Sequence, residues 1–279
     1  MISGNTVGYG GGGLFCYNAN PSIINCIISA NTAYSGGGVY CGSASPRLTD
    51  CTVSKNSASY RGGAMYCEGT SSQPSIADSI LWGDTPQEIY VYAGAAAVTY
   101  CDLQGGYAGT GNINLDPLFV DPDGPDNDPA TWQDNDYRLA AGSPCIDAGQ
   151  NSAVPADTFD LDGDGDTTEP IPFDLDGQPR FVDDPATVDC PYVPGTCGTA
   201  PIVDMGAYEY QPTAPLLGDL NCDGVVNVDD VVPFVLALVD PAGYQTAYPG
   251  CDLLRADMNG SGTADGADIQ LFVDALLGG

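Results

Sequence analysis

The chain contains no histidine and only six lysines and arginines, against 37 aspartates and glutamates, so its formal net charge is −31. The lack of histidine excludes histidine-based catalysis and histidine-ligated zinc. The shortage of basic side chains argues against binding to nucleic acid or to an anionic membrane, because almost nothing is available to neutralise phosphate. An acidic surface of this kind instead favours cations such as Ca²⁺, which takes hard oxygen ligands.

Long apolar runs and an N-terminal export signal are also missing. No apolar run reaches about 18 residues, so no membrane span is expected. The first residues, MISGNTVGYG, lack the basic start and apolar core of a signal peptide. Eleven cysteines nevertheless favour an oxidising location. We therefore expect an extracellular or cell-surface protein whose N-terminal part, signal peptide included, is missing from this chain.

The first hundred residues contain a repeat. Glycine-rich motifs end at Cys16, Cys41 and Cys67, which are 25 and 26 residues apart. Between them, apolar or small residues recur in three columns. The columns are Ile23, Leu48, Ile76 and Val98; Cys26, Cys51, Ser79 and Cys101; and Ile28, Val53, Leu81 and Leu103, with Ile2 extending the last. A further column consists of Asn5, Asn31 and Asn56, followed by Asp84.

These repeats are typical of a parallel β-helix. The units are short, β-branched and separated by glycine, and none has a ten-residue stretch of helical periodicity. We expect about five coils over residues 1–121, each paired with the next at about 4.8 Å. The cysteine columns should then point into the core, and the asparagine column should satisfy the backbone of a turn.

Three strings follow the repeats: NINLDPLFVDPDG at 112–124, DYRLAAGSPCIDAG at 136–149 and DMGAYEY at 204–210. With the repeats, they resemble a family of secreted bacterial right-handed parallel β-helix proteins that is common in planctomycete-like genomes. The resemblance covers about residues 1–210. It implies a mainly β protein in which residues 122–211 form an irregular, acidic cap of the solenoid, and it carries no activity.

One acidic segment of the cap has the spacing of a calcium loop. Four aspartates occupy alternate positions around Gly165, which stands where such a loop turns. They are Asp160, Asp162, Asp164 and Asp166. Ile171 occupies the twelfth position, where a bidentate carboxylate would close the site. The segment is therefore either a third calcium site or a solvated acidic turn, and the sequence leaves both interpretations open.

Two stronger calcium loops lie near the C-terminus. DLNCDGVVNVDD matches a 12-residue calcium loop, and DMNGSGTADGAD repeats it 38 residues later. Oxygen-bearing residues stand at alternate positions because the loop wraps around one ion, and Gly224 and Gly262 occupy the sixth position, where the chain turns sharply. The predicted ligands are Asp219, Asn221, Asp223, Val225, Asn227 and Asp230 in the first loop, and Asp257, Asn259, Ser261, Thr263, Asp265 and Asp268 in the second, with position seven contributing its backbone carbonyl.

Each loop precedes an apolar helical segment, VVPFVLALV or IQLFVDALL. Position twelve is Asp rather than Glu, and no helix precedes the first loop. In these respects residues 219–279 resemble a type I dockerin, a small all-α, EF-hand-like module, which a linker at 212–218 would join to the cap as a domain spanning 212–279. The resemblance implies two bound Ca²⁺ and attachment to a protein partner, cohesin-like or a second copy of the chain.

The partner does not carry over residue by residue. Cellulosomal dockerins often have Ser-Thr at loop positions ten and eleven and basic residues on the following helix, but this chain has other residues there and no Lys or Arg on either helix. The residues at these positions are Val228 and Asp229 in the first loop, and Gly266 and Ala267 in the second. Within the helices, we expect Val231, Phe234, Ile269 and Phe272 in the core rather than on a binding surface.

Two disulfides are expected. Cys190 and Cys197 flank the Pro/Gly loop PYVPGT, whose ends a local disulfide would join. In the dockerin-like segment, Cys222 and Cys251 would tie the first loop to the segment between the loops. Such a bond would add to metal stabilisation of a module too small for a large core.

Catalysis is the main alternative, since parallel β-helices host pectin and alginate lyases and polygalacturonases, although fold does not fix function. Asp50 and Asp78 share a column and would lie on adjacent coils, where a pair about 5 Å apart could act as a retaining pair. Asn25 occupies the same turn-like column, which favours a structural role. We interpret the chain as an extracellular, non-catalytic docking protein. The alternatives are a fragment of a polysaccharide lyase or glycoside hydrolase, with a polysaccharide ligand, and a self-assembling filament or surface subunit.

Overall fold

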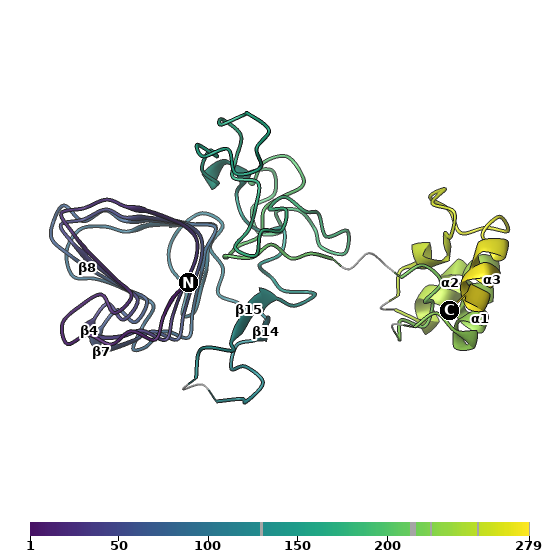
Figure 1. Cartoon of the computed structure of the whole chain (residues 1–279), viewed down its shortest axis with the longest axis horizontal. Helices are drawn as coiled ribbons and strands as arrows, with labels where there is room; N and C mark the ends of the chain where they lie inside the picture. The colour runs from purple at the N-terminus through teal and green to yellow at the C-terminus, as the bar shows by residue number, and fades with distance from the viewer. Residues whose placement is uncertain (129–130, 213–215, 224, 250, 279) are drawn as a thin grey trace. The chain divides into compact units, whose positions relative to one another are not determined.

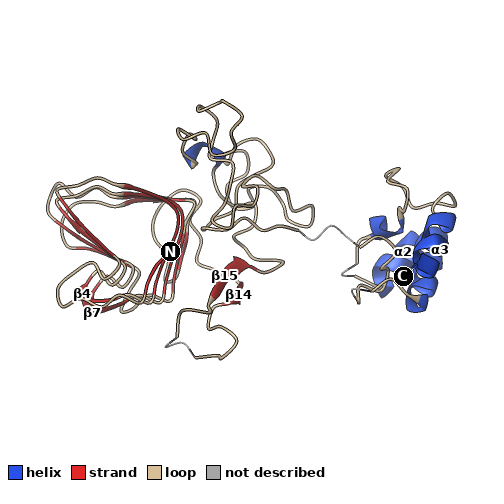
Figure 2. Ribbon diagram, viewed as in Figure 1, coloured by secondary structure: helices blue, strands red, loops and turns tan. Residues whose placement is uncertain are grey.

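The computed structural model describes residues 1–128, 131–212, 216–223, 225–249 and 251–278. The chain divides into two compact units, residues 1–212 and 213–279. Within the described residues, all strands lie in the first unit and the three α-helices lie in the second (Figures 1 and 2). None of the helices in the described ranges is long and apolar enough to cross a membrane.

Three parallel sheets form a solenoid at the start of the chain (Figure 2). The largest contains β1 (Ile2–Ser3), β3 (Ser22–Ser29), β6 (Arg47–Ser54), β9 (Ser75–Ala77), β10 (Ile80–Trp82), β12 (Ala97–Thr99) and β13 (Asp102–Leu103). The second contains β2 (Leu14–Tyr17), β5 (Val39–Gly42), β8 (Met65–Glu68) and β11 (Ile89–Val91). The third contains β4 (Thr32–Ser35) and β7 (Ser57–Arg61).

The solenoid makes about four turns rather than the expected five. Parallel pairing of named strands ends at β13, which pairs with β10. The next strand, β14 (Phe119–Asp121), pairs antiparallel with β15 (Asp136–Leu139) instead of adding a coil. The apolar columns predict coils only as far as the repeat continues. The β14–β15 hairpin lies beyond the last repeat, so the columns do not predict it.

The strand register confirms the predicted columns. Cys26 lies opposite Cys51, and Val53 lies opposite Leu81 in the parallel pairs. The remaining register pairs that match the columns are Ile2 with Ile28, Ile23 with Leu48, Ile28 with Val53, Leu48 with Ile76, Ile76 with Val98, and Leu81 with Leu103. A second cysteine stack runs from Cys16 through Cys41 to Cys67 on adjacent coils. All but the half-buried Ile2 and Cys26 are buried, so the repeats build the solenoid core.

The asparagine column satisfies turn backbone, as predicted, and its side chains also form a hydrogen-bonded ladder. Asn5 Nδ2 donates to Asn31 Oδ1 at 2.9 Å, and Asn31 Nδ2 donates to Asn56 Oδ1 at 3.0 Å. Asn56 Nδ2 then donates to Asp84 Oδ1 at 2.7 Å. Each of these oxygens also accepts a backbone N–H, so the column satisfies turn backbone on successive coils.

The rest of the first unit is mostly irregular, with the 3-10 helix η1 (Asn151–Ala153). This region packs on the largest sheet. Gly206 N–H donates to Asp78 O at 2.9 Å, and Ala207 N–H donates to Thr52 Oγ1 at 3.1 Å. Both hydrogen bonds join residues that are far apart in the sequence. The disulfide between Cys190 and Cys197 is present, as expected.

The second unit contains η2 (Val228–Asp230), α1 (Val231–Val239), α2 (Pro241–Ala247), η3 (Leu253–Ala256) and α3 (Ile269–Gly278). The rings of Phe234 and Phe272 stack at 3.9 Å between centroids, and both are buried, as expected. Val231 and Ile269 are 39% and 48% exposed, so their assignment to the core was wrong. Cys222 and Cys251 form the second expected disulfide.

Candidate metal centres

The twelfth residue of each C-terminal loop is a buried aspartate that ties the loop together. Asp230 Oδ1 accepts from Asn221 N at 3.0 Å, and its Oδ2 accepts from Asn227 N at 2.9 Å. These donors are positions three and nine of the first loop. Asp268 repeats the pattern: it accepts from Asn259 N at 3.1 Å and from Asp265 N at 2.8 Å. Both carboxylates are fully buried, so the two loops close in the same way.

The earlier positions are also matched between the loops. At position one, Asp219 Oδ1 accepts from Asp223 N at 3.1 Å, and Asp257 Oδ1 accepts from Ser261 N at 3.0 Å. The oxygens of positions three and nine likewise accept backbone N–H groups two residues ahead. The contacts at positions three and nine are Asx turns, in which the side-chain oxygen bends the chain by accepting from the backbone N–H two residues ahead.

The two loops differ in one charged contact. Arg255 Nη1 lies 3.0 Å from Asp219 Oδ2 in the first loop. In the second loop, the equivalent Asp257 Oδ2 accepts from Gly262 N at 2.6 Å. Gly262 has a φ of +86°, the left-handed turn that position six requires, whereas Gly224 lies outside the described residues.

The position-seven residues have different surroundings. The carbonyl of Thr263 accepts from Ser261 Oγ at 3.2 Å, while Val225 N–H donates to Asp223 Oδ1 at 2.9 Å. In the described ranges, groups of three or more carboxylates within 4.8 Å of one another occur elsewhere, and the carboxylates of the two terminal loops are not among them. Each loop combines its three carboxylates with amide, hydroxyl or carbonyl oxygens.

The acidic segment of the cap brings together part of its predicted set. Asp160, Asp162 and Asp164 each offer an oxygen within 4.8 Å of the others. Asp166 is not in that group, and its carboxylate accepts from Thr168. A second group consists of Asp162 with Asp157 and Glu169. Asp157 is 1% exposed and lies before the loop frame, so the alternate spacing alone could not have found it.

The acids that could have formed a catalytic pair are covered. Asp50 and Asp78 have φ angles of 52° and 47°, and Asn25 in the same column has 50°. Asn and Asp are the residues that most readily adopt this left-handed turn after glycine. Both aspartates are fully buried, so neither carboxylate faces an open groove. Their conformation accounts for their presence in the column without catalysis.

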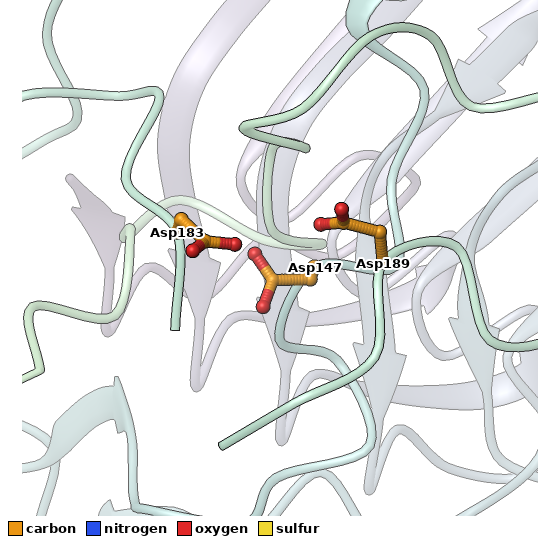
Figure 3. Close-up of side chains that lie close together, drawn as sticks. All are labelled: Asp147, Asp183 and Asp189. Carbon is orange, nitrogen blue, oxygen red and sulfur yellow. The ribbon is translucent and has the colours of Figure 1, made fainter. Parts of the chain in front are cut away.

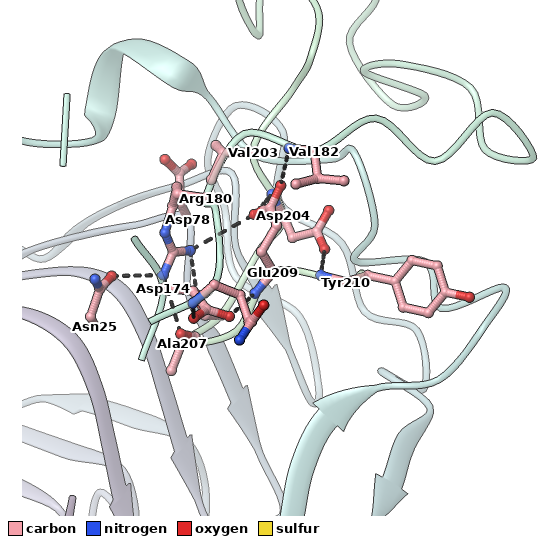
Figure 4. Close-up of polar contacts among 12 residues, drawn as sticks. Asn25, Asp78, Asp174, Arg180, Val182, Val203, Asp204, Ala207, Glu209 and Tyr210 are labelled. Atoms are coloured by element: carbon pink, nitrogen blue, oxygen red, sulfur yellow. Dashed lines mark hydrogen bonds and ion pairs between the residues drawn. The ribbon is translucent and has the colours of Figure 1, made fainter. Parts of the chain in front are cut away.

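Arg180 lies over this column and is itself fully buried (Figure 4). Its Nη2 donates to Asn25 Oδ1 at 2.7 Å and to Ala207 O at 3.1 Å. Its Nη1 lies 4.0 Å from Glu209 Oε2. Burial raises the pKa of Asp50 to about 7 although the positive charge of Arg180 opposes the rise. Burial and the neighbouring charge of Asp50 raise the pKa of Asp78 as well.

A cavity of about 460 Å³ lies in the cap, away from the solenoid coils, and its lining includes Arg138, Asp174 and Glu209. The buried acids of this lining accept hydrogen bonds from backbone N–H groups. Asp174 accepts from the N–H groups of Asp176 and Gln178 at 2.8 Å each, and Glu209 N–H donates to Asp174 Oδ2 at 3.1 Å. These acids therefore hold turns of the cap in place (Figure 4).

An apolar groove of about 300 Å³ is lined by residues of α1 and α3 in the second unit. Its lining is entirely apolar and consists of Val231, Phe234, Val235, Leu238, Val239, Ile269, Phe272, Val273 and Leu276. Val235 is 50% exposed and Val239 is 74% exposed. An exposed apolar strip of this kind is a common feature of protein-binding surfaces.

Comparison with known proteins bears on the first unit. A family model described as a right handed beta helix region matches residues 1–115, which include strands β1 to β13. No curated protein and no solved structure matched the chain. The match and the stacked parallel sheets together identify these repeats as a right-handed parallel β-helix.

Proposed function

We propose that this chain is an extracellular, non-catalytic scaffold protein whose second unit is a calcium-loaded, dockerin-like docking module. The observation that carries the proposal is the matched pair of loops. In both, a buried aspartate at position twelve accepts from positions three and nine, and an aspartate at position one accepts from position five. Each loop also supplies three carboxylates, enough to neutralise a divalent ion.

Calcium suits these loops better than other common ions. Their predicted ligand atoms are all oxygens, whereas zinc and copper favour sulfur and nitrogen ligands. Calcium accepts six to eight oxygens in flexible geometry, as a loop that mixes carboxylate, amide, hydroxyl and carbonyl groups would provide. Two disulfides, one in each unit, support an oxidising, extracellular location.

The α1–α3 groove is the proposed docking surface. Residues 216–279 contain ten aspartates, no glutamate and a single arginine, Arg255. A second copy of the chain would bring a net charge of −31 toward this acidic module, so self-association is opposed by charge. We therefore assign the groove to a cohesin-like domain with an apolar ridge that is framed by Lys and Arg.

Calorimetry of the full chain tests the calcium part of this function. At a thousandfold excess over the dissociation constant, calcium should stabilise the second unit by about 4 kcal/mol for each of its two sites. A chelator should lower the unfolding transition of the second unit. Asp223→Asn with Asp265→Asn should lower the same transition in calcium. Asp274→Asn, an exposed carboxylate outside both loops, should not. A scan that chelator leaves unaltered would contradict the proposal.

Docking requires a separate measurement. Isothermal titration of the full chain with a cohesin domain should give binding in calcium and none in chelator. Val235→Asp, which places a charge in the groove, should weaken that binding, while Asp274→Asn should preserve it. Sedimentation should show a monomer in calcium. A calcium-dependent dimer, or cohesin binding that is indifferent to Val235, would refute the assignment of the groove.

A further inference from the structure

The side chain of Asp147 meets two acidic side chains from a later segment, Asp183 and Asp189, in the cap beside the Cys190–Cys197 loop. Asp147, Asp183 and Asp189 each offer one carboxylate oxygen, and these oxygens lie within 4.8 Å of one another. Figure 3 shows the carboxylate of Asp147 between the other two. Asp147 is fully buried, whereas Asp183 and Asp189 are exposed, so the cluster has a protein side and a solvent side.

Asp147 is fixed in this position but only partly satisfied. Its N–H donates to Asp204 Oδ1 at 2.7 Å, its carbonyl accepts from Cys190 N at 2.8 Å, and its Oδ2 accepts from Asp184 N at 3.4 Å. Its Oδ1 atom is buried and has no hydrogen-bond partner. A buried carboxylate oxygen without a donor is costly, and native structures seldom leave one without a ligand.

The surroundings of Asp147 make the cost larger. Burial, together with the neighbouring carboxylates of Asp183 and Asp189, raises the pKa of its carboxyl to about 7, although the N–H of Asp184 opposes the rise. None of the ion pairs in the described part of the chain involves these three aspartates. The cluster therefore concentrates negative charge without a protein cation to balance it.

We propose that Asp147, Asp183 and Asp189 bind a calcium ion, at a site separate from both C-terminal loops. Calcium holds its oxygen ligands at roughly 2.3–2.6 Å, so oxygens around one ion lie up to about 5 Å apart, which the cluster matches. The exposed side leaves room for water to complete the shell. The ion would join the chain around Asp183 and Asp189 to the turn at Asp147, and so fasten the disulfide-closed loop to the cap.

Calcium counting on the full chain tests this site. Equilibrium dialysis should find one calcium fewer per chain for Asp183→Asn with Asp189→Asn than for the unaltered protein. The control is Asp116→Asn with Asp176→Asn, which removes the same charge from exposed positions of the same unit and should bind the full number. The other acidic loops are present in every variant, so the difference is independent of whether they bind. Equal counts in the two double variants would overturn the proposal.

A second readout follows the first unit alone, since Trp82 and Trp132 both lie in it. Calcium should raise the unfolding midpoint seen by tryptophan fluorescence less in the Asp183/Asp189 variant than in the control. If the double variant does not fold, Asp189→Asn alone is measured in the same way. An equal rise in variant and control, or a site filled by magnesium but not by calcium, would overturn the assignment.

Discussion

Replacing Asp50 with Asn tests how the buried column of the β-helix is stabilised. The carboxyl has an ordinary pKa of 3.8, and burial raises it to about 7 in the folded chain. A pKa difference of one corresponds to about 1.4 kcal/mol, so the folded state disfavours the ionised form by roughly 4 kcal/mol. The unfolded chain ionises first. The stability contributed by the protonated carboxyl is therefore present below pH 3.8 and lost as the pH rises to about 7.

Asn keeps the left-handed turn, as Asn25 shows in the same column, and cannot ionise. The advantage of Asp50→Asn over the unaltered chain should grow by roughly 3 kcal/mol between pH 5 and pH 8. Urea unfolding followed by tryptophan fluorescence at the two pH values measures it, at fixed calcium. Asp116→Asn, an exposed control, should show no comparable growth. An advantage that is constant with pH, or that shrinks at pH 8, would refute this reasoning.

Three further predictions concern other charged or reactive groups. Arg255→Gln removes the ion pair between Arg255 and the position-one carboxylate of Asp219, so calorimetry should show calcium affinity rising roughly fivefold, about 1 kcal/mol, at one site only. Burial and the charge of Asp84 raise the pKa of Glu88 to about 11, so Glu88→Gln should stabilise the β-helix more at pH 8 than at pH 5 in urea unfolding. Burial raises the pKa of the Cys51 thiol, so a maleimide should label Cys51 only after unfolding, as peptide mapping would show.

The β-helix could be predicted in detail because each coil repeats the same local requirements. The columns that begin at Ile23, Cys26 and Ile28 give the register directly, since equivalent residues of parallel coils must stack. The end of the solenoid could not be predicted in this way. The segment from Phe119 to Asp121 continues no column, and its antiparallel partner lies beyond the repeat.

The candidate sites differ in the same way: those built from neighbouring residues could be predicted from the sequence, and those built from distant residues could not. The two proposed calcium loops are local, so their candidate ligands follow from a 12-residue spacing, and matched hydrogen bonds occur in both copies. The contact of Arg180 with Asn25 spans 155 residues, and the meeting of Asp147 with Asp183 depends on how the cap folds. The sequence around one residue of such a pair says nothing about the position of the other, so no periodic pattern predicts these contacts.

A crystal structure grown in calcium, with anomalous scattering measured, tests the central claim most directly. The claim predicts one peak in each C-terminal loop, within about 2.3–2.6 Å of oxygens from Asp219 and Asp230 in the first and from Asp257 and Asp268 in the second. The carbonyls of Val225 and Thr263 should complete the two sites. Loops that hold no anomalous peak at saturating calcium, with their carboxylates bound only to backbone N–H groups, would contradict it.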